Sequence, residues 1–176
     1  MSQAADLEIR NVTPDDETAV RELLISAFPS DMEARLVHAL RHCGALLLEK
    51  VAVDASGAIV GHVAYSRVTP AAIGAGQGMQ IACLAPVSVR PDLQKTGIGS
   101  ALIRASLKQL KDLGEDLVLV LGPPAYYPRF GFDPVLARKV QGPYAGDAFM
   151  ALALTEAGSR NLPIEVAFAT PFQEFE

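Results

Sequence analysis

Apolar and polar residues alternate along much of the chain in a pattern that predicts short β-strands. Two of the apolar runs, at about 45–53 and 58–68, are joined by the turn residues Asp54-Ala55-Ser56-Gly57, which predicts a β-hairpin. The run at 116–121 has the core Leu-Val-Leu-Val-Leu, a composition typical of a strand that is buried on both faces. Further strands are expected near residues 7–12, 79–89, 149–154 and 164–169.

Apolar residues at helical spacing predict two helices before the hairpin. Thr13 is the expected N-cap of the first helix, which has an acidic opening turn and ends at Pro29. The second helix follows directly, because Ser30 and Glu33 form the pattern of a capping box and Gly44 is a suitable C-terminal stop. Glu33 is therefore interpreted first as a capping residue.

The second half of the chain adds one long helix and one short one. Apolar residues cover a broad arc of the segment at about 97–113, which is typical of a helix packed on one face of a sheet. A short helix is expected over 125–130, and the glycine- and alanine-rich stretch Pro70–Gly78 is predicted to be a loop. Since no repeat or linker divides the chain, we predict a single α/β domain over residues 1–176, built around a mixed sheet.

Composition and charge narrow the class of protein. Half of the 176 residues are hydrophobic, and the formal net charge of -5 argues against general binding to nucleic acid or to an anionic membrane. The N-terminal residues lack the basic and apolar segments of a signal peptide, and no apolar run reaches the ~20 residues that span a bilayer. A cytoplasmic location is expected. The oligomeric state stays open, a homodimer included.

The run from Val87 to Gly99 carries the clearest chemical signal. An apolar strand stops at Pro91, a polar turn follows, and Gly97-Ile98-Gly99 opens a helix. A helix N-terminus offers unpaired N–H donors and a partial positive charge, and glycine lets a phosphate approach the backbone. Lys95 adds a positive charge, and Gln94 either braces the turn or donates to a phosphate oxygen. The pattern predicts a phosphate-binding turn, although an ordinary tight turn is equally compatible with it alone.

Two common phosphate-binding motifs do not fit this turn. A P-loop requires Gly-x-x-x-x-Gly-Lys-Ser/Thr, which the sequence does not contain. A dinucleotide-binding turn requires a third small residue, but the chain has Leu102 at that position. It also requires an acidic residue after the next strand, where Leu121 leads instead into Gly122-Pro123.

Two segments resemble the GCN5-related N-acetyltransferase (GNAT) superfamily. Gln94-Lys95-Thr96-Gly97-Ile98-Gly99 is similar to the family pattern Gln/Arg-x-x-Gly-x-Gly/Ala, and Tyr127-Pro128-Arg129-Phe130-Gly131-Phe132 resembles the family's Tyr-x-x-Phe/Leu-Gly-Phe segment. The residues at 122–126 and 149–152 further resemble the YhbS-like branch. The resemblance implies a GNAT-like fold, with a mixed, mostly antiparallel sheet of about six to seven strands and about four helices.

The same resemblance implies acetyl-CoA as the co-substrate and assigns residues to its site. In the family the glycine turn holds the pyrophosphate, and the preceding strand pairs with the pantetheine arm. The cofactor-binding residues implied in this way are Val87, Ser88, Val89, Gln94, Lys95, Thr96, Gly97, Ile98, Gly99 and Ser100. Tyr127 is implied to be the general acid for the leaving thiolate, with Tyr126 as second choice and a packed core aromatic as the alternative role. No metal is expected.

The general base is not specified by the sequence. The strand before the glycine turn contains no carboxylate, although some relatives place a glutamate there. His62 is a candidate base, directly or through water, and Glu33 is a candidate for binding a cationic acceptor; a buried structural histidine and a capping residue are the alternatives. His38 and His42 have a spacing that suits zinc but no evident third ligand, and Cys83 has no partner base, so it is interpreted as a core residue.

The leading function is an N-acetyltransferase that moves an acetyl or other acyl group from acetyl-CoA to a primary amine by direct attack in a ternary complex. The amine belongs either to a small molecule or to a protein. Two alternatives stay open: a non-catalytic acyl-CoA-binding sensor or regulatory module, and an acyltransferase whose donor is a longer acyl chain or an acyl carrier protein. The sequence does not specify the acceptor.

Overall fold

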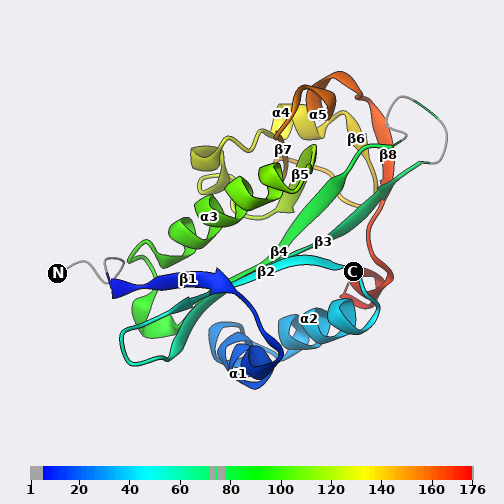
Figure 1. Ribbon diagram of the computed structural model, residues 1–176. Helices are drawn as coiled ribbons and strands as arrows, with labels where there is room; N and C mark the ends of the chain where they lie inside the picture. The colour runs from blue at the N-terminus through cyan, green and yellow to red at the C-terminus, as the bar shows by residue number, and fades with distance from the viewer. Residues whose placement is uncertain (1–5, 72–73, 75–77, 176) are drawn as a thin grey trace.

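A strongly twisted sheet runs through the centre of the molecule (Figure 1). The computed structural model describes residues 6–71, 74 and 78–175. Six strands follow one another across the sheet in the order β1-β2-β3-β4-β5-β7. Their bounds are Glu8–Asn11 (β1), Leu46–Val53 (β2), Ile59–Pro70 (β3), Ile81–Val89 (β4), Leu117–Leu121 (β5) and Phe149–Ala153 (β7).

Two short strands complete the eight-stranded sheet within the described residues. β8 (Ile164–Ala167) pairs with the end of β3, and β6 (Val140–Gln141) pairs with β8. The β4–β5 and β6–β8 pairs are parallel and the other strand pairs are antiparallel. The predicted mixed and mostly antiparallel α/β fold is therefore confirmed, while the two-residue strand β6 is too short to have a sequence signal.

Helices cover both faces of the sheet. α3 (Ile98–Asp112) lies on one face, and α1 (Glu17–Ala27) and α2 (Met32–His42) lie on the other (Figure 1). Two helices of about one turn, α4 (Pro134–Ala137) and α5 (Glu156–Arg160), lie beside β7. No helix within the described ranges is long and apolar enough to cross a membrane.

The helix boundaries differ from the sequence predictions in detail. The first helix opens with a 3₁₀ turn at Pro14–Asp16, and the short helix expected over 125–130 is a 3₁₀ turn at Tyr127–Phe130. Glu33 does not form the predicted capping box, because α2 begins after Asp31 and the Glu33 Oε2 atom is buried without a hydrogen-bond partner. Most of the predicted loop at 70–78 lies outside the described residues.

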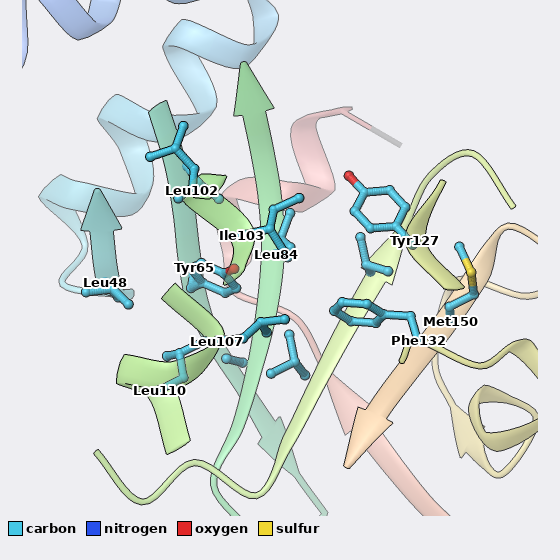
Figure 2. Packing of buried hydrophobic residues seen from close by; sticks show 14 of the residues in the cluster. Leu48, Tyr65, Leu84, Leu102, Ile103, Leu107, Leu110, Tyr127, Phe132 and Met150 are labelled. Atoms are coloured by element: carbon cyan, nitrogen blue, oxygen red, sulfur yellow. The ribbon is translucent and has the colours of Figure 1, made fainter. Parts of the chain in front are cut away.

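A large apolar core between α3 and the sheet fixes the position of that helix. Leu102, Ile103, Leu107 and Leu110 of α3 pack on Tyr65 and Leu84 of the sheet (Figure 2). α3 lies very close to β3 at Gly61, where an added Cβ would lie 2.9 Å from both Ile98 Cγ2 and Leu102 Cδ1. Because glycine has no side chain, the first turns of α3 sit directly on the β3 backbone. The N-terminus of α3 is thereby held beside the end of β4.

Candidate active site

β4 and β5 pair over only part of their length. Their parallel register runs from Ile81↔Leu117 to Leu84↔Val120, and β4 then continues to Val89 without a partner on that side. The register with β3 also shifts here, since Tyr65 pairs with Leu84 and Val63 pairs with Val87, so β4 has one extra residue in a bulge. The sheet therefore has a gap beside the second half of β4.

The backbone of β4 offers free hydrogen-bonding groups to this gap. Arg90 N–H donates to Val60 C=O of β3 at 2.9 Å, and backbone groups alternate in direction along a strand. Val87 and Val89 therefore direct their N–H and C=O groups away from β3 and into the gap. The Gln94 Nε2 atom donates to Val89 C=O at 3.2 Å, in agreement with this direction. An extended ligand can pair with such an edge as an added strand.

The glycine turn connects this edge to α3. Lys95 has a φ of 64° and Gly97 a φ of 97°, both in the left-handed region, and Gly97 is the N-cap of α3 without any side-chain cap. No N-cap side chain therefore accepts a hydrogen bond from the first backbone N–H groups of α3. An anion site at a helix N-terminus requires such unpaired N–H groups. The hydroxyl of Thr96 donates to Leu93 C=O, and the side chain of Ile98 is buried in the core.

One cavity of about 600 Å³ unites the strand edge and the glycine turn. Eight of the ten residues assigned to the cofactor line it; the side chains of Thr96 and Ile98 do not, and if these two residues take part they do so through their backbone. Its charged lining residues are Lys95 and Arg129. A cavity with this size and lining suits a large anionic ligand.

The cavity also has lining residues that the sequence did not assign to it. Ala27 and Phe28, at the end of α1, close it from the opposite face of the sheet. Arg129 lies inside the quoted tyrosine segment, and its guanidinium stacks 4.5 Å from the ring centre of Tyr126. The positive charge of Arg129 was the feature of the sequence that could have assigned this residue to an anion site. Nothing in the sequence predicts that the end of α1 lies beside the glycine turn.

The two neighbouring tyrosines occupy different environments. Tyr126 lines the cavity, and its hydroxyl lies 3.0 Å from the Ser100 hydroxyl at the start of α3. Tyr127 is only 5% exposed and packs in the core against Phe132, with ring centres 5.8 Å apart. Tyr127 is not among the residues that line the cavity. Its hydroxyl points away from Phe132, and no described residue forms a hydrogen bond to it (Figure 2). Burial, reinforced by Tyr126 and Cys83, raises the pKa of Tyr127 to about 12.

Gly122 fixes the position of the Tyr127 ring. A Cβ at residue 122 would lie 2.3 Å from Cε2 of Tyr127, so an added methyl group requires the packed ring to move. We expect Gly122→Ala to lower the free energy of unfolding by about 1–3 kcal/mol, because overpacking forces neighbouring side chains out of place. Denaturant unfolding of the purified variant checks this. A free energy of unfolding equal to that of the wild type would show that the ring can move without cost.

The remaining candidates are His62, Cys83 and the pair His38 and His42. The His62 Nε2 atom lies 2.9 Å from Glu49 Oε1, so His62 has a carboxylate partner. Burial raises the pKa of Cys83 to about 12, which keeps the thiol protonated and unreactive. The rings of His38 and His42 contact each other with centroids 4.1 Å apart, and no group of three potential metal ligands occurs among the described residues.

Comparison with known proteins connects this geometry to a family. Residues 8–135, which include the gap, the glycine turn and the tyrosine segment, match the family model of the acetyltransferase (GNAT) domain. The chain belongs to the GNAT acetyltransferase family.

Two curated GNAT relatives from Escherichia coli K12 cover most of its length. The sequence is 38% identical to the protein named uncharacterized N-acetyltransferase YhbS over 125 residues, which are 71% of this chain and 72% of that protein. It is 35% identical to uncharacterized N-acetyltransferase YjhQ over 131 residues, 70% of this chain and 68% of that one.

Two crystal structures of GNAT proteins share the whole fold. The YhbS structure from Escherichia coli, in complex with CoA, superimposes with a TM-score of 0.87 at 32% identity, covering 97% of this chain and 94% of that one. A GNAT acetyltransferase from Brucella melitensis, in complex with acetyl-CoA, gives a TM-score of 0.76 at 32% identity, with 94% and 97% covered. The predicted resemblance to the YhbS-like branch is confirmed.

Proposed function

We propose that the chain is an acetyl-CoA-dependent N-acetyltransferase acting on a primary amine of a small molecule or protein. The acetyl group passes from the thioester directly to the amine in a ternary complex. The observation that carries the proposal is that the unpaired edge of Val87–Val89 and the glycine turn line one cavity. The likeness to structures that hold CoA or acetyl-CoA supports the same ligand here.

Each part of the cavity suits one part of this ligand. The first amides of α3, with Lys95 and Arg129, match the negative charge of the pyrophosphate and its neighbouring phosphate. The N–H and C=O groups of Val87 and Val89 match the two amides of the pantetheine arm, which would replace β5 as the neighbour of β4. The thioester then lies where β4 and β5 separate. A β4 N–H in this position also stabilises the oxyanion that forms when the amine attacks.

Tyr127 is the general acid of this proposal. Its raised pKa keeps the phenol protonated at physiological pH, and its hydroxyl is not engaged by any described residue, so its proton can go to the leaving thiolate. Tyr126 suits a different role, because its hydroxyl contacts Ser100 at the glycine turn and its ring stacks against the guanidinium of Arg129. We assign Tyr126 to holding the phosphate end of the site.

Turnover with a panel of amines tests the proposed function. The purified protein is mixed with acetyl-CoA and, in turn, a polyamine, an aminoglycoside and a lysine-containing peptide, and free thiol and acetylated product are measured. We expect thiol release that depends on both the amine and the protein, with one acetyl group added to the amine. Tight acetyl-CoA binding in calorimetry without turnover on any amine would instead favour an acyl-CoA sensor. Turnover only with longer acyl donors or an acylated carrier protein would contradict the choice of acetyl-CoA.

A further inference from the structure

A row of buried polar side chains crosses the sheet beneath the proposed thioester site. Glu49 on β2, His62 on β3 and Ser88 on β4 lie on adjacent strands, and His62 and Ser88 are directly paired across the two strands. His62 is fully buried and Ser88 is 4% exposed. Directly paired residues place their side chains on the same face of a sheet, with Cβ atoms about 5 Å apart. Burial of a histidine and a serine beside a carboxylate that is only 10% exposed requires an explanation.

Hydrogen bonds account for one end of the row but not the other. Glu49 accepts a hydrogen bond from Arg41 of α2 at 2.8 Å and lies 2.9 Å from the Nε2 atom of His62. The second ring nitrogen of His62, Nδ1, and the Oγ atom of Ser88 are both buried without a hydrogen-bond partner. Buried polar atoms are nearly always paired in native proteins, so two neighbouring unpaired atoms indicate a functional position.

Glu49 determines which nitrogen of His62 can accept a proton. Burial alone raises the pKa of Glu49, but the hydrogen bonds from His62 and Arg41 outweigh it, and the pKa lies below its usual value. An ionised carboxylate only accepts hydrogen bonds, so the Nε2 atom of His62 carries the hydrogen that Glu49 receives. The lone pair of neutral His62 is therefore on Nδ1, the atom that has no partner.

Ser88 connects this histidine to the cavity. Ser88 lines the cavity together with Val87 and Val89, whose backbone is the proposed pantetheine edge, and with Phe28 on the opposite face of the sheet. An amine that attacks the thioester from the α1 side meets Ser88 before it reaches His62. A carboxylate, an imidazole and a hydroxyl in this order form a path for a proton leading away from the reacting amine.

We propose that Ser88, His62 and Glu49 form the proton relay that deprotonates the amine. The relay takes the place of the carboxylate base that β4 lacks. The inference rests on the proposed function. The amine nitrogen forms a bond to the thioester carbon, and its proton passes to the Ser88 hydroxyl while the proton of Ser88 moves to His62 Nδ1. The carbon–sulfur bond breaks with its electron pair on sulfur, which takes the proton of Tyr127. His62 and Tyr127 then exchange protons with solvent, and the products are the amide and free coenzyme A.

Other charged groups near His62 are compatible with this path. Glu49 from β2 stabilises the imidazolium that forms, while Arg41 of α2 is balanced by Glu49 and by Glu17 of α1, whose Oε1 atom lies 3.5 Å from Arg41 Nε. Arg90, which directly follows β4, is paired with Asp92 at 2.7 Å. The positive charge that develops on His62 therefore faces the Glu49 carboxylate, whose Oε1 atom His62 shares with Arg41. Glu49 is a positioning residue in this arrangement.

A matched pair of serines tests the relay. Ser66 lies on the same strand as His62, is fully buried and also has an unpaired Oγ atom, but it pairs with Cys83 and does not line the cavity. Neither Ser88→Ala nor Ser66→Ala removes a hydrogen bond, so both variants are expected to fold and to bind coenzyme A like the wild type. We expect Ser88→Ala to lower kcat for the best amine of the panel about tenfold, and Ser66→Ala to leave it unchanged.

The pH profile separates a proton relay from a structural role. His62→Gln keeps an amide that can donate to Glu49, and its kcat/KM is expected to fall about 100-fold at neutral pH and to recover as rising pH deprotonates the amine in solution. The profile of the wild type should therefore be flatter above neutral pH than the profile of this variant. Equal kcat for the two serine variants, or a pH profile of His62→Gln that runs parallel to that of the wild type, would overturn the relay alone. Absence of amine-dependent thiol release by the wild type would overturn the proposed function together with the relay.

Discussion

Replacement of Gly99 by tryptophan is expected to weaken coenzyme A binding strongly while leaving the protein folded. Gly99 lies in the first turn of α3 and lines the cavity, and a Cβ at this position would point to within 3.5 Å of the Tyr126 hydroxyl and 3.6 Å of Val89 Cγ2. A large side chain built from there fills the space between the helix N-terminus and β4, which the phosphates would occupy. Overpacking of this kind costs a few kcal/mol, so we expect affinity to fall about 100-fold or more in isothermal titration calorimetry.

Gly99→Ala is the matched control for this experiment. The added methyl group would meet its two nearest neighbours at ordinary van der Waals distance, and Gly99 has no left-handed backbone that an alanine would strain. The alanine variant should therefore bind coenzyme A within a few-fold of the wild type, and both variants should unfold at temperatures close to that of the wild type. A tryptophan variant that binds as tightly as the alanine variant would show that the phosphates lie elsewhere.

Tyr127→Phe is expected to reduce kcat about 100-fold or more with little change in coenzyme A affinity or stability. The substitution removes the proposed acid for the leaving thiolate, and general acid catalysis typically contributes 100-fold or more. The ring that packs on Phe132 stays in place, and no described residue loses a hydrogen bond. Because the pKa of Tyr127 is raised to about 12, the phenol stays protonated past the ordinary tyrosine value of about 10, so ionisation of Tyr127 should not lower wild-type activity at moderately alkaline pH.

Tyr126→Phe separates the two tyrosines. This variant loses the contact between Tyr126 and the Ser100 hydroxyl at the glycine turn, so we expect a weaker affinity for coenzyme A of a few-fold and a kcat near that of the wild type. Steady-state kinetics and calorimetry on both variants provide the comparison. The opposite result, with turnover lost in Tyr126→Phe and kept in Tyr127→Phe, would transfer the role of acid to Tyr126.

Sequence patterns predicted the strands and long helices because these elements are defined by local periodicity. The run at 117–121 and the helix before it are examples, since each carries its apolar pattern within a few residues. α4 and α5 were missed because a helix of about one turn has no period to detect. Their caps were the available signal, since the side chains of Asp133 and Thr155 accept hydrogen bonds from the first turns of these helices.

The candidate site was predictable where one contiguous segment builds it and unpredictable where distant segments meet. The glycine turn is local, and its residues could be assigned from the motif. The approach of Phe28 to the cavity and of Glu49 to His62 depends on how α1 and β2 pack against β3 and β4, which no spacing in the sequence encodes. The gap between β4 and β5 is likewise a property of strand register. The resemblance to a family implied only that the strand before the glycine turn pairs with a ligand, and the pairing of Leu84 with Val120 defines where the gap starts.

The unpaired edge of β4 has a thermodynamic consequence for the free protein. At Val87 and Val89 a strand in the middle of the sheet leaves its N–H groups to water, because no neighbouring strand of the described chain pairs with them on that side. A ligand that docks there adds ladder hydrogen bonds to the native state, and none of these exist once the chain has unfolded. The concentration of that ligand relative to its Kd therefore sets part of the folding stability of the domain, by RT ln(1 + [L]/Kd). The midpoint of thermal unfolding is therefore expected to rise with the concentration of any ligand that pairs with this edge.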